Sequence, residues 1–310
     1  RIDVFSSFSI HAIENNYTKP VITDKTVLKI KKGRHPVVEK LLPVTEKFIA
    51  NDLTIDSSIN QIQLLTGPNM AGKSTYLRQT GLIALLAHIG SYVPAEKALI
   101  GVIDRLFTRV GASDNLAGGE STFLVEMNEA ANILNNATNH SLILLDEIGR
   151  GTATYDGLSI AWSITEYLHE KEEVRARTIF ATHYHELTIL EKSLKRLENH
   201  YVVVKEHDDN IIFMRSISKG TGDKSYGIQV AKMAGLPKVV IERAKEVLAS
   251  HLLEKRKSNK KIPKLNFNQI NFFREKDSAL IKKIKNIDIN DITPIEALLI
   301  LKDLKNEFDN

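Results

Sequence analysis

The chain has 310 residues, of which 43% are hydrophobic, and this is enough to bury the core of one large domain or of two. It has no cysteine, which excludes disulfides, thiolate metal sites and thiol catalysis and favours a reducing compartment, and no apolar run reaches the roughly 18 residues of a membrane helix. The net charge is +4, and the excess of positive charge lies in residues 251–285, which contain 11 Lys or Arg and 3 Asp or Glu. Either nucleic-acid binding or a solvated linker is expected there.

The predicted elements begin with a helix over residues 1–17, which the spacing of its apolar side chains indicates. The first residue is Arg1 and not methionine, so we expect a fragment of a longer protein. Prolines interrupt the mixed segment that follows, in which residues 27–30 are expected to form a short strand. Strands and helices then alternate as 61–66 (strand), 74–89 (helix), 102–109 (strand), 121–138 (helix), 141–146 (strand), 157–170 (helix) and 177–182 (strand). This rhythm predicts an α/β fold with a mostly parallel sheet flanked by helices.

The C-terminal part is predicted to be helical after one β-hairpin. Its expected elements are hairpin strands 200–206 and 211–217, helices 225–235 and 237–256, a linker over 257–268 and a final helix that starts at residue 293. Thr293, Pro294 and Glu296 carry the signature of a capped helix start. The apolar face of that last helix indicates packing against another subunit.

The strongest chemical signal is the sequence Gly-Pro-Asn-Met-Ala-Gly-Lys-Ser at residues 67–74, which matches the phosphate-loop pattern G-x-x-x-x-G-K-[ST] between a predicted strand and a predicted helix. The glycines of such a loop let backbone N–H groups turn toward a phosphate at the positive end of the next helix. Lys73 would then reach the β- and γ-phosphates of a nucleotide, and the Ser74 hydroxyl would hold Mg²⁺. The alternative is a chance glycine-rich turn.

Two carboxylates end the apolar run at residues 141–147, and ligands of parallel α/β sheets bind beyond such strand ends. Asp146 is therefore expected to hold Mg²⁺, and Glu147 to polarise the attacking water as a general base. His183 ends another apolar strand at the same sheet edge, where its imidazole could touch the γ-phosphate or the water. A purely structural histidine is the equally open alternative.

Three further segments are candidates for the same site. Ser121 follows a glycine pair at the start of a predicted helix, so it is either an ordinary helix cap or an anion site that a partner subunit supplies to the γ-phosphate. The position of the turn-rich loop 149–157 beside Glu147 favours subunit contact or signalling of the nucleotide state, and the alternative is a plain connection. Phe48 and Ile49 precede the first core strand, where an aromatic ring could stack on adenine or simply pack in the core.

Four motifs in this order and spacing resemble the ATPase domain of the MutS family of DNA mismatch-repair proteins, over roughly residues 1–250: TGPNMAGKST, STFLVEM, LLDEIGRGTATYDG and FATHYHEL. The resemblance implies a P-loop NTPase of ABC-ATPase-like type that uses ATP and Mg²⁺. It also implies a division into the end of a lever helix (1–17), an ATPase domain (18–220), a helix-turn-helix dimerisation element (221–256), a linker (257–268) and a helical oligomerisation tail (269–310).

The resemblance also implies a role for individual residues. Glu147 and His183 would be catalytic, Ser74 and Asp146 would serve Mg²⁺, and Ser121 would contact the nucleotide of the partner subunit, so that two composite sites form across a dimer. The residues expected to bind the nucleotide are Phe48, Ile49, Gly67, Pro68, Asn69, Met70, Ala71, Gly72, Lys73, Ser74, Thr75 and Arg215.

Two positions depart from the pattern of the family. Ala71 stands where glycine is frequent, and its methyl group is tolerable if the backbone there is not at positive φ. Arg215 stands where many bacterial members have histidine on the second face of adenine, and a guanidinium can also stack on a ring.

The resemblance also implies the partners and the location. The chain would form a homodimer, or a tetramer through the tail, and would work with a MutL-type repair partner. Mismatched double-stranded DNA would be bound through domains missing from this chain. The location would be the bacterial cytoplasm near the nucleoid. Two alternatives stay open, a MutS-like paralogue acting on recombination intermediates or stalled ribosomes and a nucleotide-independent DNA-binding scaffold. The scaffold does not explain why Lys73, Asp146 and Glu147 are all present.

Overall fold

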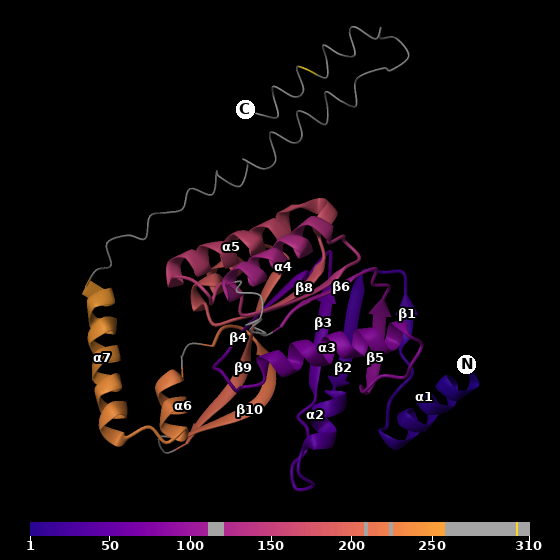
Figure 1. The fold of residues 1–310 in the computed structure, drawn as a ribbon, viewed down its shortest axis with the longest axis horizontal. Coiled ribbons are helices and arrows are strands. Elements are labelled where there is room, and N and C mark those ends of the chain that lie inside the picture. The colour runs from indigo at the N-terminus through magenta and orange to yellow at the C-terminus, as the bar shows by residue number, and fades with distance from the viewer. Residues whose placement is uncertain (111–120, 208–209, 223–225, 258–301, 303–310) are drawn as a thin grey trace. The chain divides into compact units, whose positions relative to one another are not determined.

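The computed structural model describes residues 1–110, 121–207, 210–222, 226–257 and 302, and the chain divides into two units, Arg1–Ile241 and Glu242–Asn310. Within the first unit, two β-sheets and the helices that flank them form a mixed α/β fold (Figure 1). The predicted α/β class is therefore confirmed at this level.

The larger sheet has six strands in the order β10-β9-β4-β8-β7-β6. Its strands are β4 (Ile62–Thr66), β6 (Leu106–Arg109), β7 (Leu142–Asp146), β8 (Arg177–Thr182), β9 (Leu197–His207) and β10 (Asn210–Lys219). All neighbouring strands are parallel except β9 and β10, which form the predicted antiparallel hairpin. The carboxyl ends of β4, β7 and β8 consequently lie at one edge of the sheet, where ligands of such sheets bind.

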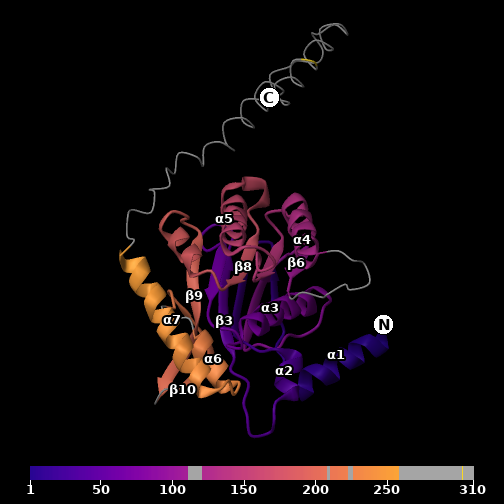
Figure 2. The ribbon, with the colours of Figure 1, turned by 60° about the vertical axis from the view of Figure 1, so that its left-hand side comes forward.

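Helices cover both faces of this sheet because its central strands, rich in apolar residues, are buried on both sides. On β7, the neighbouring residues Ile143 and Leu144 belong to two different cores. The core of Leu144 includes the buried side of α3 (Lys73–His88), and the core of Ile143 includes α4 (Thr122–Asn136) and α5 (Thr154–Glu170). Figure 2 accordingly shows α4 and α5 on one side of the sheet and α3 on the other.

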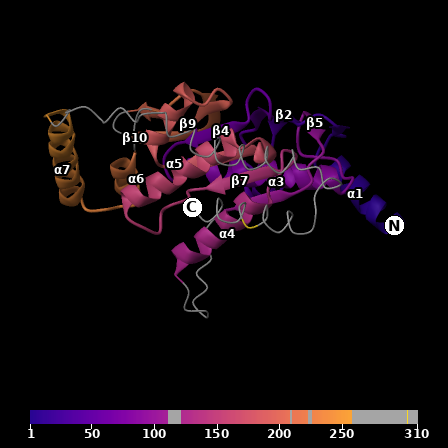
Figure 3. The ribbon, with the colours of Figure 1, turned by 90° about the horizontal axis from the view of Figure 1, so that it is seen from above.

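A smaller sheet of four strands has the order β1-β5-β2-β3 and lies on the side of the molecule where α1 is found (Figures 1 and 3). Its strands are β1 (Val21–Thr23), β2 (Val27–Gly33), β3 (Asn51–Asp56) and β5 (Lys97–Gly101). The sequence predicts only β2. The single strand predicted over 102–109 is wrong in its first half, because Asp104 accepts hydrogen bonds from the hydroxyls of Thr138 (2.6 Å) and Ser141 (2.9 Å) and turns the chain from one sheet to the other.

A buried arginine joins the two sheets. Arg177, the first residue of β8, has no exposed surface. Its guanidinium donates to four backbone carbonyls, those of Val27 (3.3 Å), Gly101 (3.3 Å), Val102 (3.0 Å) and His140 (2.6 Å). Burial lowers the pKa of Arg177 to about 10, so the side chain stays charged at neutral pH. A single cation at the start of β8, in the larger sheet, therefore satisfies carbonyls of β2 and β5 in the smaller sheet and of two loop residues.

Replacing Arg177 with methionine is expected to lower the free energy of unfolding by about 3 kcal/mol or more, because it leaves buried carbonyl groups without donors. Urea unfolding followed by circular dichroism measures this change. The matched control is Lys97→Met, which removes an exposed cation from β5 and should change stability by less than about 0.5 kcal/mol. A loss of similar size in both variants would contradict the role given to Arg177.

The remaining elements are α1 (Ile2–Glu14), α2 (Pro36–Leu41), the 3₁₀ helices η1 (Glu172–Val174) and η2 (His185–Lys192), α6 (Gly227–Met233) and α7 (Lys238–Lys257). Helices α1, α6 and α7 occupy predicted helical segments, whereas α2, η1 and η2 are additional. Apart from Lys257 and Lys302, the predicted linker and final helix lie outside the described residues. Among the helices that the structure describes, none combines the length and the apolar character that a membrane crossing requires.

Candidate functional site

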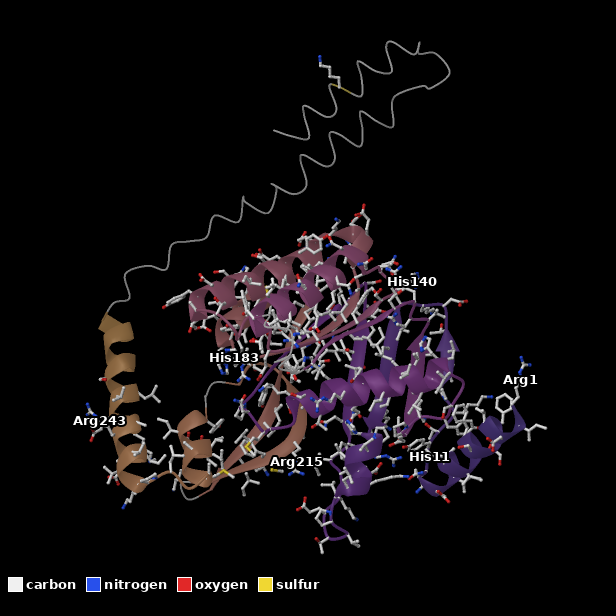
Figure 4. The ribbon with its side chains drawn as sticks, in the orientation of Figure 1. Arg1, His11, His140, His183, Arg215 and Arg243 are labelled. Carbon is white, nitrogen blue, oxygen red and sulfur yellow. The ribbon has the colours of Figure 1, made fainter. Side chains whose placement is uncertain are left out.

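Three neighbouring strand ends bring the predicted residues to one edge of the larger sheet. β4 leads into the loop at residues 67–72, β7 ends at Asp146 and Glu147, and β8 leads into His183, which is labelled in Figure 4. Since β8 pairs in parallel with both β4 and β7, these ends are adjacent. The structure thus gathers residues that lie more than a hundred positions apart in the chain.

The loop between β4 and α3 turns sharply. Gly67 (φ 149°), Met70 (φ 66°) and Gly72 (φ 106°) have positive φ, and α3 begins directly after Gly72. Such turns point successive N–H groups to one side, at the positive end of the 16-residue helix α3. Ala71 is buried and is not among the residues at positive φ, so its methyl group is accommodated without backbone strain.

Lys73 is the first residue of α3, directly after this loop, and 4% of its side chain is exposed. Its Nζ donates to the carbonyl oxygens of Gly67 (2.7 Å) and Pro68 (3.1 Å) and lies 3.4 Å from Glu147 Oε1. Burial lowers the pKa of Lys73, and the charge of Glu147 acts in the opposite direction. A cation that is held this way at the start of α3 suits an anion bound by the same loop.

Asp146 and Ser74 form a pair of hard oxygen donors. Burial raises the pKa of Asp146, and the neighbouring Ser74 side chain acts in the opposite direction. Asp146 Oδ1 is buried and has no hydrogen-bond partner within the described structure. A buried carboxylate oxygen without a donor is costly, and a divalent cation would satisfy it. Among the described residues, no group of three or more His, Cys, Asp or Glu side chains is arranged so that it could hold a metal ion.

Glu147 has a left-handed backbone (φ 57°), held by a hydrogen bond from its N–H to the carbonyl of Ala181 (2.8 Å). Its carboxylate forms an ion pair with Arg150 in addition to its contact with Lys73. The amide of Asn69 bridges the pair when its orientation is assigned from its partners, which places its nitrogen 3.3 Å from Glu147 Oε1 and its oxygen 3.2 Å from Arg150 Nη2. The phosphate loop and the loop after β7 therefore meet at Glu147.

His183 is half-buried at the end of β8, and its Nδ1 is buried without a hydrogen-bond partner in the described structure. Its ring packs against Tyr184, with the ring centroids 4.2 Å apart. Burial lowers the pKa of His183, and the charge of Arg150 acts in the same direction. A neutral imidazole with a free ring nitrogen can exchange a hydrogen bond with a phosphate or a water.

Ser121 occupies the N-cap position of α4, but its side chain makes no capping hydrogen bond, and the residue is exposed. Ser121 is thus an N-cap by position, without the hydrogen bond from the first turn to its hydroxyl that such a cap usually has. Residues 111–120, which precede it, lie outside the described part. A role of Ser121 toward a partner subunit stays a prediction.

The residues predicted around adenine lie on two segments that Asn51 connects. Phe48 is half-buried and Ile49 is exposed, just before β3, and Arg215 (φ 53°) lies within an irregular part of β10. The Asn51 amide donates to the carbonyls of Ile49 (3.2 Å) and Arg215 (2.9 Å), and its oxygen accepts from the N–H of Ile217 (2.8 Å). The exposed Arg215 lies 3.8 Å from Glu46. Whether these side chains hold a base stays a prediction.

Sequence reasoning missed Arg150 and Asn51 as supporting residues of the site. Arg150 lies in the loop that was singled out beside Glu147, and a cation three residues after a carboxylate is a signal that could have identified it. Asn51 carries no such signal, because its contacts with Arg215 and Ile217 join segments more than 160 positions apart.

Comparison with known proteins gives one matching family model, described as MutS domain V, over residues 63–252. Curated relatives named DNA mismatch repair protein MutS include those of Bacteroides thetaiotaomicron (55% identical), Chlorobaculum parvum (53%) and Salinibacter ruber (51%). Each alignment covers 98% of this chain and 35–37% of the relative, so the chain spans about a third of the length of these proteins.

The family model covers more than half of the chain and includes the phosphate loop, the carboxylates after β7 and His183. The relatives are similar over nearly the whole chain, including the segments before and after the matched domain. Both findings agree with the motifs at the sheet edge. This chain belongs to the MutS family.

Proposed function

We propose that this chain is the ATPase and dimerisation portion of a DNA mismatch-recognition protein, and that it binds Mg²⁺-ATP at the edge of the larger sheet and hydrolyses it to ADP and phosphate. The observation that carries the proposal is the buried, unpartnered Oδ1 of Asp146 beside Ser74, with Lys73 and Glu147 on the adjoining loops. The names of the relatives favour mismatch repair over the paralogue and scaffold alternatives.

In this proposal each residue has a separate task. The N–H groups of loop 67–72 and the start of α3 hold the phosphates, and Lys73 turns from the loop carbonyls toward the β- and γ-phosphates. Ser74 and Asp146 would hold Mg²⁺, which when bound neutralises part of the phosphate charge. Glu147 polarises the attacking water and accepts its proton.

His183 supports the same step from the end of β8. A neutral imidazole donates a hydrogen bond to the γ-phosphate or orients the water, and the lowered pKa of His183 keeps that form dominant at neutral pH. Phe48, Ile49 and Arg215 would hold adenine, and Asn51 would keep their two segments together. This arrangement accounts for binding and for chemistry without further residues of the same subunit.

A second subunit is required to complete each site. Ser121 at the exposed start of α4 would contact the nucleotide of the partner, and α6 with α7 would form the dimerisation element. ATP would close the two subunits, and the change would reach DNA-binding domains that precede this chain through α1. The same proposal includes mismatched double-stranded DNA as the ligand of those domains and a MutL-type repair partner. It also includes a tetramer formed by the tail and a cytoplasmic location.

The test is the dependence of ATP turnover on Mg²⁺ and on Asp146. Chelating Mg²⁺ is expected to abolish turnover, and Asp146→Asn is expected to raise the Mg²⁺ concentration that gives half-maximal turnover by roughly tenfold or more, because a neutral amide is a poorer ligand. The measurement is phosphate release against Mg²⁺ concentration. Asp24→Asn, which changes an exposed carboxylate between β1 and β2, is the matched control and should leave that concentration unchanged. Turnover that is independent of Mg²⁺ would overturn the proposal.

A further inference from the structure

Helix α4 carries a buried carboxylate that the proposed function does not use. Glu126 lies five residues after Ser121 and is 6% exposed. One of its oxygens accepts a hydrogen bond from the backbone N–H of Gly149, and the other lies 3.5 Å from the guanidinium of Arg109, the last residue of β6. A buried carboxylate is costly unless it is paired and hydrogen-bonded, and here both conditions are met.

The group that Glu126 holds belongs to the catalytic loop. Gly149 lies between Glu147 and Arg150, which form an ion pair with each other. The backbone of Gly149 is left-handed (φ 93°), and a Cβ there would lie 2.6 Å from the carbonyl oxygen of Gly157. Its own carbonyl accepts a hydrogen bond from the Tyr184 hydroxyl (2.9 Å). The peptide groups of Gly149 are thus fixed on one side by α4 and on the other by the segment after β8.

A second contact joins the same helix to the same loop. A Cβ on Gly151 would lie 2.9 Å from the Cβ of Phe123, so the first turn of α4 packs directly against the backbone of the loop. Because α4 is a continuous helix from Thr122 to Asn136, a movement of its start is transmitted to both contacts. The close packing leaves little room for the loop and the helix to move independently.

We propose that Glu126 is a positioning residue that ties the catalytic loop of its own subunit to the helix whose Ser121 contacts the nucleotide of the partner. The inference rests on the proposed function, since only a composite site gives Ser121 a nucleotide to contact. When the partner's phosphate engages Ser121, the shift of α4 is passed through Glu126 to Gly149, and from there to Glu147 and Arg150. Because such coupling is reciprocal, the same contact also holds the start of α4, and with it Ser121, at the partner's nucleotide. The two ATP sites of a dimer are coupled by this contact.

The first test concerns the loop within one subunit. Glu126→Leu is expected to speed amide hydrogen exchange at Gly149 by roughly tenfold or more and to lower kcat about tenfold with little change in KM for ATP. Glu126→Gln keeps an acceptor oxygen and should restore most of both properties. The matched control is Glu129→Gln, since Glu129 also lies beside Arg109 (3.0 Å) on α4, is 47% exposed and has no contact with Gly149 in the described structure.

The second test concerns the coupling between subunits, in mixed dimers in which one subunit carries Lys73→Ala and so leaves a single working site in its partner. That working site has its own intact catalytic loop and receives Ser121 from the Lys73→Ala subunit. Adding Glu126→Leu to the Lys73→Ala subunit is expected to lower phosphate release at the working site several-fold. Adding Ser121→Ala to that subunit instead measures how much phosphate release at the working site falls when the contact of Ser121 with the nucleotide is absent.

The outcomes separate the two claims. If Ser121→Ala lowers turnover and Glu126→Leu does not, the composite site stands and the coupling is overturned. If neither changes turnover, the composite site itself is wrong, and the coupling falls with it. Should Glu126→Leu fail to fold, the double change Arg109→Met with Glu126→Leu, which removes both charges of the buried pair, takes its place with the same expected losses.

Discussion

Replacing Glu147 with glutamine is expected to leave ATP binding nearly unchanged and to lower turnover by about 10²–10⁴-fold, the range over which a general base contributes to rate. The substitution keeps the shape of the side chain and an oxygen that can accept from Arg150, but it removes the charge that polarises water. Binding is measured by titration with a fluorescent ATP analogue, and turnover by phosphate release under single-turnover conditions.

Glu172→Gln provides the matched control, because Glu172 is an exposed carboxylate (77%) that likewise pairs with an arginine three residues on. It should leave both measurements at their original values. Unchanged turnover in Glu147→Gln would remove Glu147 from the reaction. Lost binding in that variant would instead show that its contact with Lys73 is needed to shape the loop.

Replacing Lys73 with alanine is expected to weaken nucleotide binding on the order of a hundredfold, because one or two charge-assisted hydrogen bonds to phosphate oxygens are lost. The same change leaves the carbonyls of Gly67 and Pro68 without their donor and Glu147 with one cation fewer. Calorimetric titration with ATP measures the affinity. The contrast with Glu147→Gln, which should bind but not turn over, separates binding from chemistry.

Lys219→Ala is the matched control for Lys73→Ala. Lys219 is an exposed cation (66%) paired with Glu198 (2.7 Å), and its loss should leave the affinity for ATP unchanged. Thermal unfolding of Lys73→Ala without nucleotide tests whether the fold is retained. A folded Lys73→Ala protein that binds ATP as tightly as the original chain would contradict the assignment of the phosphate loop.

The parts of the fold that follow from consecutive residues could be predicted. The strands β4, β7 and β8 are short segments rich in apolar residues, and the phosphate-loop motif follows β4 in eight adjacent residues, so pattern alone identifies them. The strand β3 could not, because it reads Asn-Asp-Leu-Thr-Ile-Asp, and its polar residues favour turns when seen alone. Only pairing with β2 makes it a strand.

The supporting contacts of the site were harder to predict because they join distant parts of the chain. Arg177 reads as a charged residue at the start of a strand, and nothing local shows that four carbonyls surround it. Glu126 reads as a polar position on an amphipathic helix, whereas its partner Gly149 lies 23 residues away. Chemistry that depends on residue type was visible in the sequence, and positioning that depends on packing was not.

The central claim is that the phosphates of ATP lie in the loop at residues 67–74 and that the neighbouring subunit completes the site with Ser121. The most direct test is an experimental structure of this chain with Mg²⁺ and a non-hydrolysable ATP analogue. We expect the triphosphate along that loop, Mg²⁺ held by Ser74 and Asp146, and the Ser121 hydroxyl of a second copy at the γ-phosphate. An analogue bound elsewhere, or phosphates that no second copy approaches, would contradict the central claim.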